Sequence, residues 1–206
     1  MRLVFTKMQH EIQQGVKGLI FDLDGTLADT MPYHFDAWRK ACRKYGADID
    51  NTFLRKHTGS PGWLIAGEII KKCNLNGSVT IDQIMEEKLH EFFKIQHLAK
   101  PIDPVADIAK KYYGKLPMAI GTGGHREAVE RTLSLTGLRK YFEIIVTAND
   151  VDNFKPHPET FLRCAELMKV DPAHIEVFED GDQGLRAARM AGMIATDVRT
   201  WYDSNW

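Results

Sequence analysis

Two hydrophobic patterns alternate along the chain. Short, nearly continuous apolar segments predict strands that are buried on both faces of a parallel sheet, at residues 19–23, 116–120, 143–147, 175–178 and 194–198. Apolar residues at helical spacing predict helices over residues 105–113, 125–135, 159–168 and 183–191. Because strands that alternate with helices are typical of a parallel sheet with crossover helices, we predict an α/β doubly wound core.

The stretch between the first and second predicted strands has a different pattern. It contains no strand-like run, and its apolar residues recur at helical spacing over residues 32–46, 63–73 and 80–97. Residues 50–57 receive no assignment, and neither do residues 1–15 or the tail at 201–206. We therefore predict a helical insert at residues 31–99 within a core formed by residues 1–30 and 100–206.

Composition and charge restrict the possible partners. With 206 residues and 44% hydrophobic composition the chain can form a real core. A net charge of −1 provides no basic field for nucleic acid or for a membrane surface, so a small-molecule partner is favoured. Three cysteines far apart indicate reduced thiols, and no segment suits a signal peptide or a membrane span. We expect a cytoplasmic protein, as a monomer or weak dimer.

The first predicted strand delivers two acids to one place. Asp22 lies where this strand ends, Asp24 follows two residues later, and Gly25 permits a sharp turn. Two carboxylates this close repel each other unless a cation lies between them, most simply Mg²⁺. An ordinary Asp-Gly turn explains the same residues equally well. A calcium loop of the EF-hand type is excluded, because its first and last ligand positions would fall on Ile20 and Met31.

Polar groups also follow the other predicted strands. Thr122, within residues 121–124, offers a hydroxyl and exposed amides to an anion, although a threonine helix cap explains it as well. Lys155 precedes a proline, and a lone lysine is usually a surface charge. Glu179 and Asp180 end a strand, where acids can also cap a helix. Since parallel strands open onto one crevice, the joint occurrence favours one active site.

This order of groups resembles the haloacid dehalogenase superfamily over nearly the whole chain. The stretch from Asp22 to Thr26 resembles its first motif, Thr122 the second, Lys155 the third and Glu179-Asp180 the fourth. The helical insert resembles the subclass with a small α-helical cap, which includes β-phosphoglucomutase and sugar-phosphate phosphatases. Residues 59–63 and 178–180 are similar to bacterial fructose-1-phosphate phosphatases.

The resemblance implies a role for each motif residue. Asp22 would be the nucleophile that forms an aspartyl-phosphate, and Asp24 the general acid and then the base. Mg²⁺ would be held by Asp22, the Asp24 backbone carbonyl and Asp180, with Glu179 orienting this site indirectly. The phosphoryl oxygens would be bound by Thr122, the Gly123 amide and Lys155.

The substrate is predicted less directly. The second acid, Asp24, favours phosphoryl transfer over carbon–halogen cleavage, and residues 59–63 lack the arginine with which the mutase holds a second phosphate. We therefore expect a phosphatase for small phosphorylated sugars, such as fructose 1-phosphate or 6-phosphogluconate, with β-phosphoglucomutase as the alternative. His34 and Lys88 are predicted substrate contacts, although a packed histidine and a charged helix face explain them too.

A signalling receiver is an alternative from a different class of protein. It also places acids, a hydroxyl, a lysine and Mg²⁺ around a phosphorylated aspartate. However, receivers place their acid pair on the first strand and the phosphoryl acceptor on a later one, and they have no helical cap. The helical insert therefore favours the enzyme.

Overall fold

The computed structural model describes residues 11–203, so residues 1–10 and 204–206 of the predicted core lie outside the described part. Within it, five strands form one parallel sheet in the order β3-β2-β1-β4-β5. The strands are β1 (Gly18–Phe21), β2 (Met118–Gly121), β3 (Ile144–Val146), β4 (Ile175–Glu179) and β5 (Ile194–Asp197). The predicted strands and the doubly wound fold are confirmed, and β1 lies in the middle of the sheet.

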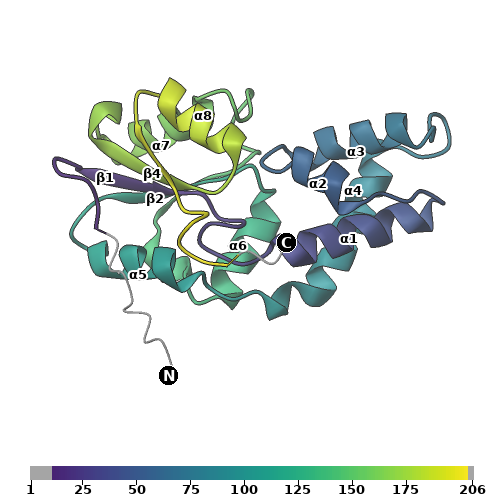
Figure 1. Ribbon diagram of the computed structural model, residues 1–206, viewed down its shortest axis with the longest axis horizontal. Coiled ribbons are helices and arrows are strands. Elements are labelled where there is room, and N and C mark those ends of the chain that lie inside the picture. Colours follow the sequence, from purple (N-terminus) through teal and green to yellow (C-terminus); the bar gives the residue numbers. More distant parts are fainter. Residues whose placement is uncertain (1–10, 204–206) are drawn as a thin grey trace.

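Two pairs of helices cover the two faces of this sheet (Figure 1). Their bounds are α5 (Asp103–Tyr112), α6 (Arg126–Leu135), α7 (Glu159–Met168) and α8 (Asp182–Met190). Along β1, Leu19 and Phe21 pack in one apolar cluster with α5 and α6, whereas Ile20 packs in a second cluster with α7 and α8. This alternation follows from the two-residue period of a strand, and it explains why β1 is continuously apolar.

The helical insert lies beside the sheet, next to the loop that follows β1 (Figure 1). It contains α1 (Met31–Lys44), α2 (Asn51–Lys56), α3 (Gly62–Lys72) and α4 (Ile81–Ile95). These helices share an apolar cluster of their own, with Phe35, Leu54 and Ile69 among its buried members. Its division from the core as a separate domain stays a prediction.

Helix α2 is the element that the pattern did not assign. It has six residues and one buried side chain, Leu54, so it is too short to show a helical period. Its start carries a local signal, because the Asp50 carboxylate accepts a hydrogen bond of 2.7 Å from the Phe53 amide.

Two expectations from composition can be compared with the structure. Cys42, Cys73 and Cys164 are all free, as their spacing predicted. Among residues 11–203, every helix is too short or too polar to cross a bilayer.

Candidate active site

The residues that follow the strands meet at one edge of the sheet. Asp22 follows β1, Thr122 follows β2, Asp180 follows β4, and Lys155 lies between β3 and α7. All four side chains are buried. Asp22, Thr122 and Asp180 line one cavity of about 110 Å³, and Lys155 touches Asp22. The fold thus brings together the four groups that the sequence predicted for one crevice.

Lys155 is a buried cation between two carboxylates. Its Nζ atom lies 2.7 Å from Asp22 Oδ1 and 2.8 Å from Glu179 Oε1. The same ammonium lies 4.6 Å from the centre of the Phe161 ring, a favourable cation–π distance. Burial alone would lower the pKa of Lys155, but Asp22 and Glu179 hold it above its usual value. The lysine therefore stays charged beside Asp22.

Lys155 alone does not offset the negative charge of the three neighbouring acids, Asp22, Glu179 and Asp180. Burial raises the pKa of Asp22 to about 8; Lys155 opposes this rise, and Glu179 adds to it. The pKa of Asp180 is also well above its usual value, because of burial and the neighbouring Glu179 and Asp22 carboxylates. A further cation would relieve this repulsion.

The cluster fits a divalent cation with oxygen ligands. Asp22, Glu179 and Asp180 can each offer one ligand atom within 4.8 Å of the others. Asp180 Oδ2 is buried and has no hydrogen-bond partner among the described residues, whereas Oδ1 accepts a hydrogen bond of 2.7 Å from the Thr26 hydroxyl. The Thr26 contact was not predicted, although a hydroxyl directly after the Asp-Gly turn was an available signal.

Glu179 differs from the other two acids, because its oxygens are already engaged. Oε1 accepts from Lys155, and Oε2 accepts a hydrogen bond of 2.5 Å from the Gly181 amide. Asp22 and Asp180 are therefore the carboxylates best placed to bind Mg²⁺ directly.

Asp24 is held by Thr30, the last residue before the helical insert, and by His34 of the insert. Its Oδ1 atom accepts a hydrogen bond of 2.6 Å from the Thr30 hydroxyl and lies 3.1 Å from His34 Nε2. Lys88 Nζ lies 2.9 Å from His34 Nδ1. A lysine ammonium can only donate, so these partners make Nδ1 an acceptor and Nε2 the donor to Asp24. His34 and Lys88, the predicted substrate contacts, therefore form a hydrogen-bonded series that ends at Asp24.

The groups around Asp24 set the pKa of its carboxyl group. Burial alone would raise its pKa, but the His34 imidazole and the Thr30 hydroxyl outweigh burial and lower the pKa. The ionised carboxylate is therefore favoured, and this is the form that can accept a proton.

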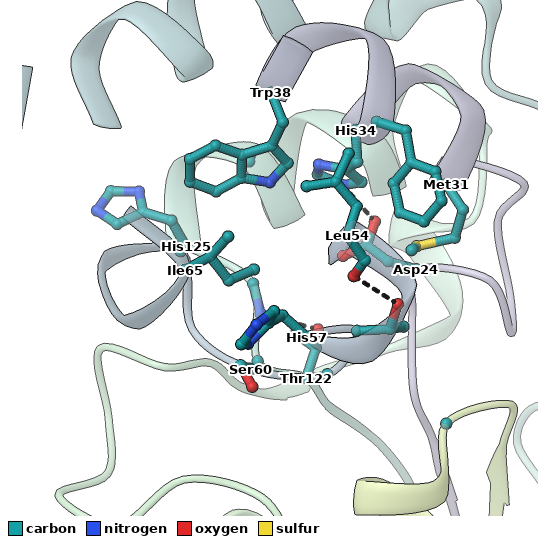
Figure 2. Close-up of a pocket in the computed structure, with 18 of the residues that line it drawn as sticks. Asp24, Met31, His34, Trp38, Leu54, His57, Ser60, Ile65, Thr122 and His125 are labelled. Carbon is teal, nitrogen blue, oxygen red and sulfur yellow. Dashed lines mark hydrogen bonds and ion pairs between the residues drawn. The ribbon is translucent and has the colours of Figure 1, made fainter. Parts of the chain in front are cut away.

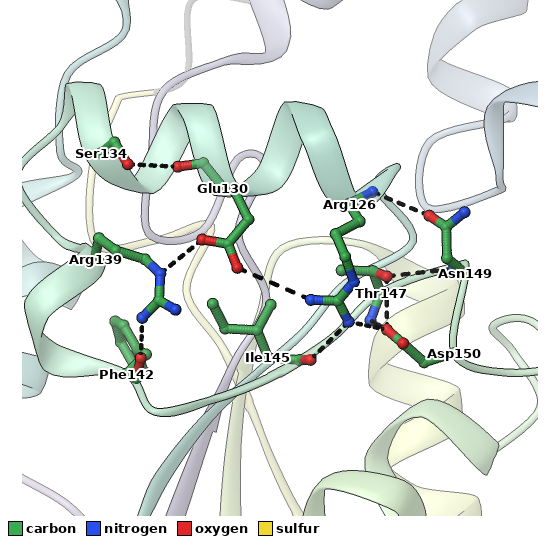
Figure 3. Close-up of polar contacts among 9 residues, drawn as sticks. All are labelled: Arg126, Glu130, Ser134, Arg139, Phe142, Ile145, Thr147, Asn149 and Asp150. Carbon is green, nitrogen blue, oxygen red and sulfur yellow. Dashed lines mark hydrogen bonds and ion pairs between the residues drawn. The ribbon is translucent and has the colours of Figure 1, made fainter.

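Hydrogen bonds within the loop after β2 and with the segment after β3 hold this loop in place. The Thr122 hydroxyl accepts a hydrogen bond of 3.1 Å from the Gly124 amide, and the Gly124 carbonyl accepts one of 3.1 Å from the Ala148 amide. Arg126, at the start of α6, pairs with Asp150 at 2.5 Å (Figure 3). These contacts hold the loop that carries Thr122, whose side chain lines the same cavity as Asp22.

The helical insert forms the opposite wall of the cavity. Its lining side chains are mostly apolar: Met31, Phe35, Trp38, Leu54, Trp63, Ile65, Met85 and Leu89. The wall comes very close to the loop after β2, because a Cβ atom on Gly123 would lie 2.9 Å from the Gly59 carbonyl oxygen. A cavity closed on one side by apolar side chains and on the other by charged groups suits a small phosphorylated molecule.

Two histidines of the cavity had no predicted role. His57 of the helical insert and His125 of the core both line it (Figure 2). Their positions in the sequence show no ligand spacing, so only the fold could have identified them.

Comparisons with known proteins agree with this geometry. A family model for haloacid dehalogenase-like hydrolases matches residues 19–198. The fructose-1-phosphate phosphatase YqaB of Escherichia coli is 42% identical over 184 residues, which cover 88% of this chain and 96% of that protein. A phosphorylated carbohydrates phosphatase of Thermotoga maritima is 32% identical over 180 residues, covering 86% of this chain and 82% of that one.

A solved structure shows the same fold. The β-phosphoglucomutase of Clostridium difficile superposes with a TM-score of 0.79 at 26% identity, covering 88% of this chain and 84% of that one. The family match spans the sheet and the helical insert, and all four strand-end groups lie within it. The chain therefore belongs to the haloacid dehalogenase-like hydrolases.

Proposed function

We propose that this protein is a Mg²⁺-dependent phosphatase that hydrolyses small phosphorylated sugars of the fructose 1-phosphate or 6-phosphogluconate type. The observation that carries the proposal is the contact between Asp22 and Lys155, beside the unpartnered oxygen of Asp180. A buried carboxylate with a fixed cation next to it is suited to attack a phosphoryl group. The 42% identity to a fructose-1-phosphate phosphatase supports the substrate class.

The first half of the reaction transfers the phosphoryl group to Asp22. An Asp22 carboxylate oxygen attacks phosphorus in line, and the bond from phosphorus to the sugar oxygen breaks. That oxygen takes a proton from the Asp24 carboxyl group. Thr122, the Gly123 amide and Lys155 would bind the phosphoryl oxygens and offset their charge.

The second half releases phosphate. A water molecule attacks phosphorus of the aspartyl-phosphate, gives a proton to the Asp24 carboxylate, and displaces the Asp22 oxygen. Inorganic phosphate leaves and the Asp22 carboxylate is restored. The lowered pKa of Asp24 suits this step, in which it acts as a base. The proton that Asp24 takes from water here restores the carboxyl form that the first half of the reaction uses.

The residues that would hold Mg²⁺ are the Asp22 carboxylate, the Asp24 backbone carbonyl and Asp180. When bound, the ion supplies positive charge that neutralises the phosphoryl oxygens. Glu179 would support the site indirectly, through its bonds to Lys155 and to the Gly181 amide.

The leaving sugar would lie against the helical insert. His34, Lys88 and the indole of Trp38 line that side of the cavity. A mutase has to hold a bisphosphate at both ends, and residues 59–63 carry no arginine for the second phosphate. Water is therefore favoured over a second sugar as the phosphoryl acceptor.

The test is phosphate release from a panel that includes fructose 1-phosphate, 6-phosphogluconate and β-glucose 1-phosphate, with Mg²⁺ and with a chelator. We expect release that depends on Mg²⁺, fastest with one or more of the sugar phosphates. Isomerisation of β-glucose 1-phosphate after priming with a bisphosphate, without release, would replace the phosphatase by a mutase. A long-lived phosphorylated Asp22 without release would point to a receiver instead.

A further inference from the structure

The described end of the chain packs against the strands that carry the acids. Residues 199–203 follow β5, and the Trp201 ring lies edge-on to Phe178 with 5.9 Å between ring centres. Phe178 in turn stacks on Phe21 at 4.9 Å. Phe21 directly precedes Asp22, and Phe178 directly precedes Glu179. The tail, which showed no pattern in the sequence, therefore packs against Phe178, and Phe178 packs against Phe21; each of these rings directly precedes an acid of the site.

The next residue of the tail reaches the loop between the acids. The Tyr202 hydroxyl donates a hydrogen bond to the Gly25 carbonyl oxygen. The Gly25 amide donates one of 2.9 Å to the Ala28 carbonyl. Both backbone polar atoms of Gly25 are thus engaged, and one of these two bonds comes from a side chain 177 residues away.

Gly25 lies close beside the Asp180 oxygen that lacks a partner, with no room for a side chain between them. Its φ of +88° is a conformation that favours glycine, and a Cβ atom there would lie 2.4 Å from Asp180 Oδ2. The peptide bond before Gly25 is planar and contains the Asp24 carbonyl, and the next residue, Thr26, binds the other oxygen of Asp180. A shift of Gly25 would therefore move both of the predicted ligands beside it.

The surroundings keep Tyr202 able to donate. Its side chain is half-buried, and the carboxylates of Asp180, Asp29 and Asp22 are close enough to act on it. Burial and this negative charge raise the pKa of the phenol, so its proton stays in place.

We propose that Tyr202 is a positioning residue for the cation site, because its hydroxyl holds Gly25 in place beside Asp180. The inference rests on the proposed function, since it assumes that Asp22, Asp180 and the Asp24 carbonyl bind Mg²⁺. The tail would then support catalysis by positioning the loop around Gly25, without any contact with the substrate.

The test compares Tyr202→Phe, which removes only the hydroxyl, with Tyr45→Phe. Tyr45 is the matched control because its hydroxyl donates to the backbone carbonyl of Gln83 at 3.2 Å, within the helical insert. Calorimetric titration with Mg²⁺ in the absence of substrate should show roughly 10-fold weaker binding for Tyr202→Phe and wild-type binding for Tyr45→Phe. Hydrogen exchange of residues 23–28 should be faster only in Tyr202→Phe.

Activity gives a second, independent readout. At saturating Mg²⁺ the Tyr202→Phe variant should recover the wild-type kcat with an unchanged KM for the sugar phosphate, because only the cation site is affected. A lasting loss of kcat at saturating Mg²⁺, or equal Mg²⁺ affinities for Tyr202→Phe and wild type, would overturn the inference.

The two proposals can fail separately. Wild-type protein that binds Mg²⁺ but releases no phosphate from any substrate would refute the proposed function, and the comparison of Mg²⁺ affinities would still test Tyr202. Wild-type protein that does not bind Mg²⁺ would overturn the inference itself. Thermal unfolding of both variants checks that the fold is intact.

Discussion

At Asp22, burial and the Lys155 ammonium act in opposite directions on one carboxylate. Burial raises its pKa to about 8, and Lys155, 2.7 Å away, favours the charged form. A phosphate monoester brings further negative charge to the same place, and like charges at contact repel strongly where water is excluded. In the proposed mechanism, Lys155 and a bound cation would therefore both be needed before Asp22 could approach phosphorus.

Replacing this carboxylate by an amide tests its role. We expect Asp22→Asn to lower phosphate release by ~10³-fold or more, because a nucleophile acts as a unit with its neighbours and an amide forms no aspartyl-phosphate. The fold should stay intact, since the change removes a buried charge while Lys155 keeps Glu179 as a partner. Phosphate release and circular dichroism measure the two effects.

The matched control is Asp29→Asn. Asp29 lies in the same segment, but its side chain is exposed and does not line the cavity. This variant should keep wild-type activity. Full activity of Asp22→Asn would refute the nucleophile assignment.

Some residues of the site were predictable because of how parallel sheets are built. The carboxyl ends of parallel strands share one edge, so Asp22, Thr122 and Asp180 could be placed together from strand patterns alone. The contacts of Thr26 and Tyr202 could not, because their partners lie 154 and 177 residues away in the sequence. Contacts of that kind depend on packing, which a single sequence does not reveal.

Between elements, two loops of the site come very close to each other. The loop between α2 and α3 meets the loop after β2 where Gly59 faces Gly123. A Cβ atom on Gly123 would lie 2.9 Å from a backbone oxygen, which cannot rotate away as a flexible side chain can. The helical insert and the loop after β2 can therefore stay this close only when residue 123 has no side chain.

The substitution Gly123→Ala should separate these loops. We expect kcat/KM for the best sugar phosphate to fall by about 100-fold, since small displacements of positioning groups are costly in catalysis. The unfolding transition in urea should change little, because the contact lies at the rim of a cavity. The control is Gly67→Ala within α3, where the nearest side-chain atom, Ile81 Cδ1, is 3.7 Å away.

In that control the activity should be unchanged, and stability should rise by about 0.5–1 kcal/mol, because alanine is the better helix former. Wild-type kcat/KM for Gly123→Ala would show that the two loops need not touch for catalysis.

The helices themselves were predictable to different degrees. Long helices with a buried stripe, such as α1 and α7, were found from their period, whereas the six-residue α2 was not. On α4, Lys88 resembles its charged neighbours Glu86, Glu87 and Glu91 in sequence, yet it is buried against His34. Periodicity identifies a face of a helix, but it does not say which charged residue of that helix faces a cavity.

Over the whole molecule the net charge is −1, but negative charge is concentrated at the edge of the sheet. The buried carboxylates of Asp22, Glu179 and Asp180 gather around one buried lysine, Lys155. Burying charge without full compensation destabilises a fold. The arrangement therefore reduces the stability of the metal-free protein and favours binding of a cation.

This concentration of charge couples metal binding to the stability of the whole fold. A ligand that binds only the folded state stabilises it by about 2.7 kcal/mol at 100 times its Kd, which corresponds to roughly 5–11 °C in Tm for a domain of this size. We expect Mg²⁺ to raise the Tm of the wild-type protein by such an amount relative to protein in chelator, measured by calorimetry.

The variant Asp180→Asn separates the destabilisation by buried charge from the stabilisation by Mg²⁺. In chelator its Tm should equal or exceed that of wild type, because a repelled buried carboxylate becomes a neutral amide whose oxygen still accepts the Thr26 hydroxyl. Mg²⁺ should then add little, since the unpartnered oxygen is gone. Asp152→Asn, an exposed acid outside the cavity, should respond to Mg²⁺ as wild type does. If Asp180→Asn is stabilised by Mg²⁺ as strongly as wild type, the cation binds elsewhere, and the acids around Lys155 do not form its site.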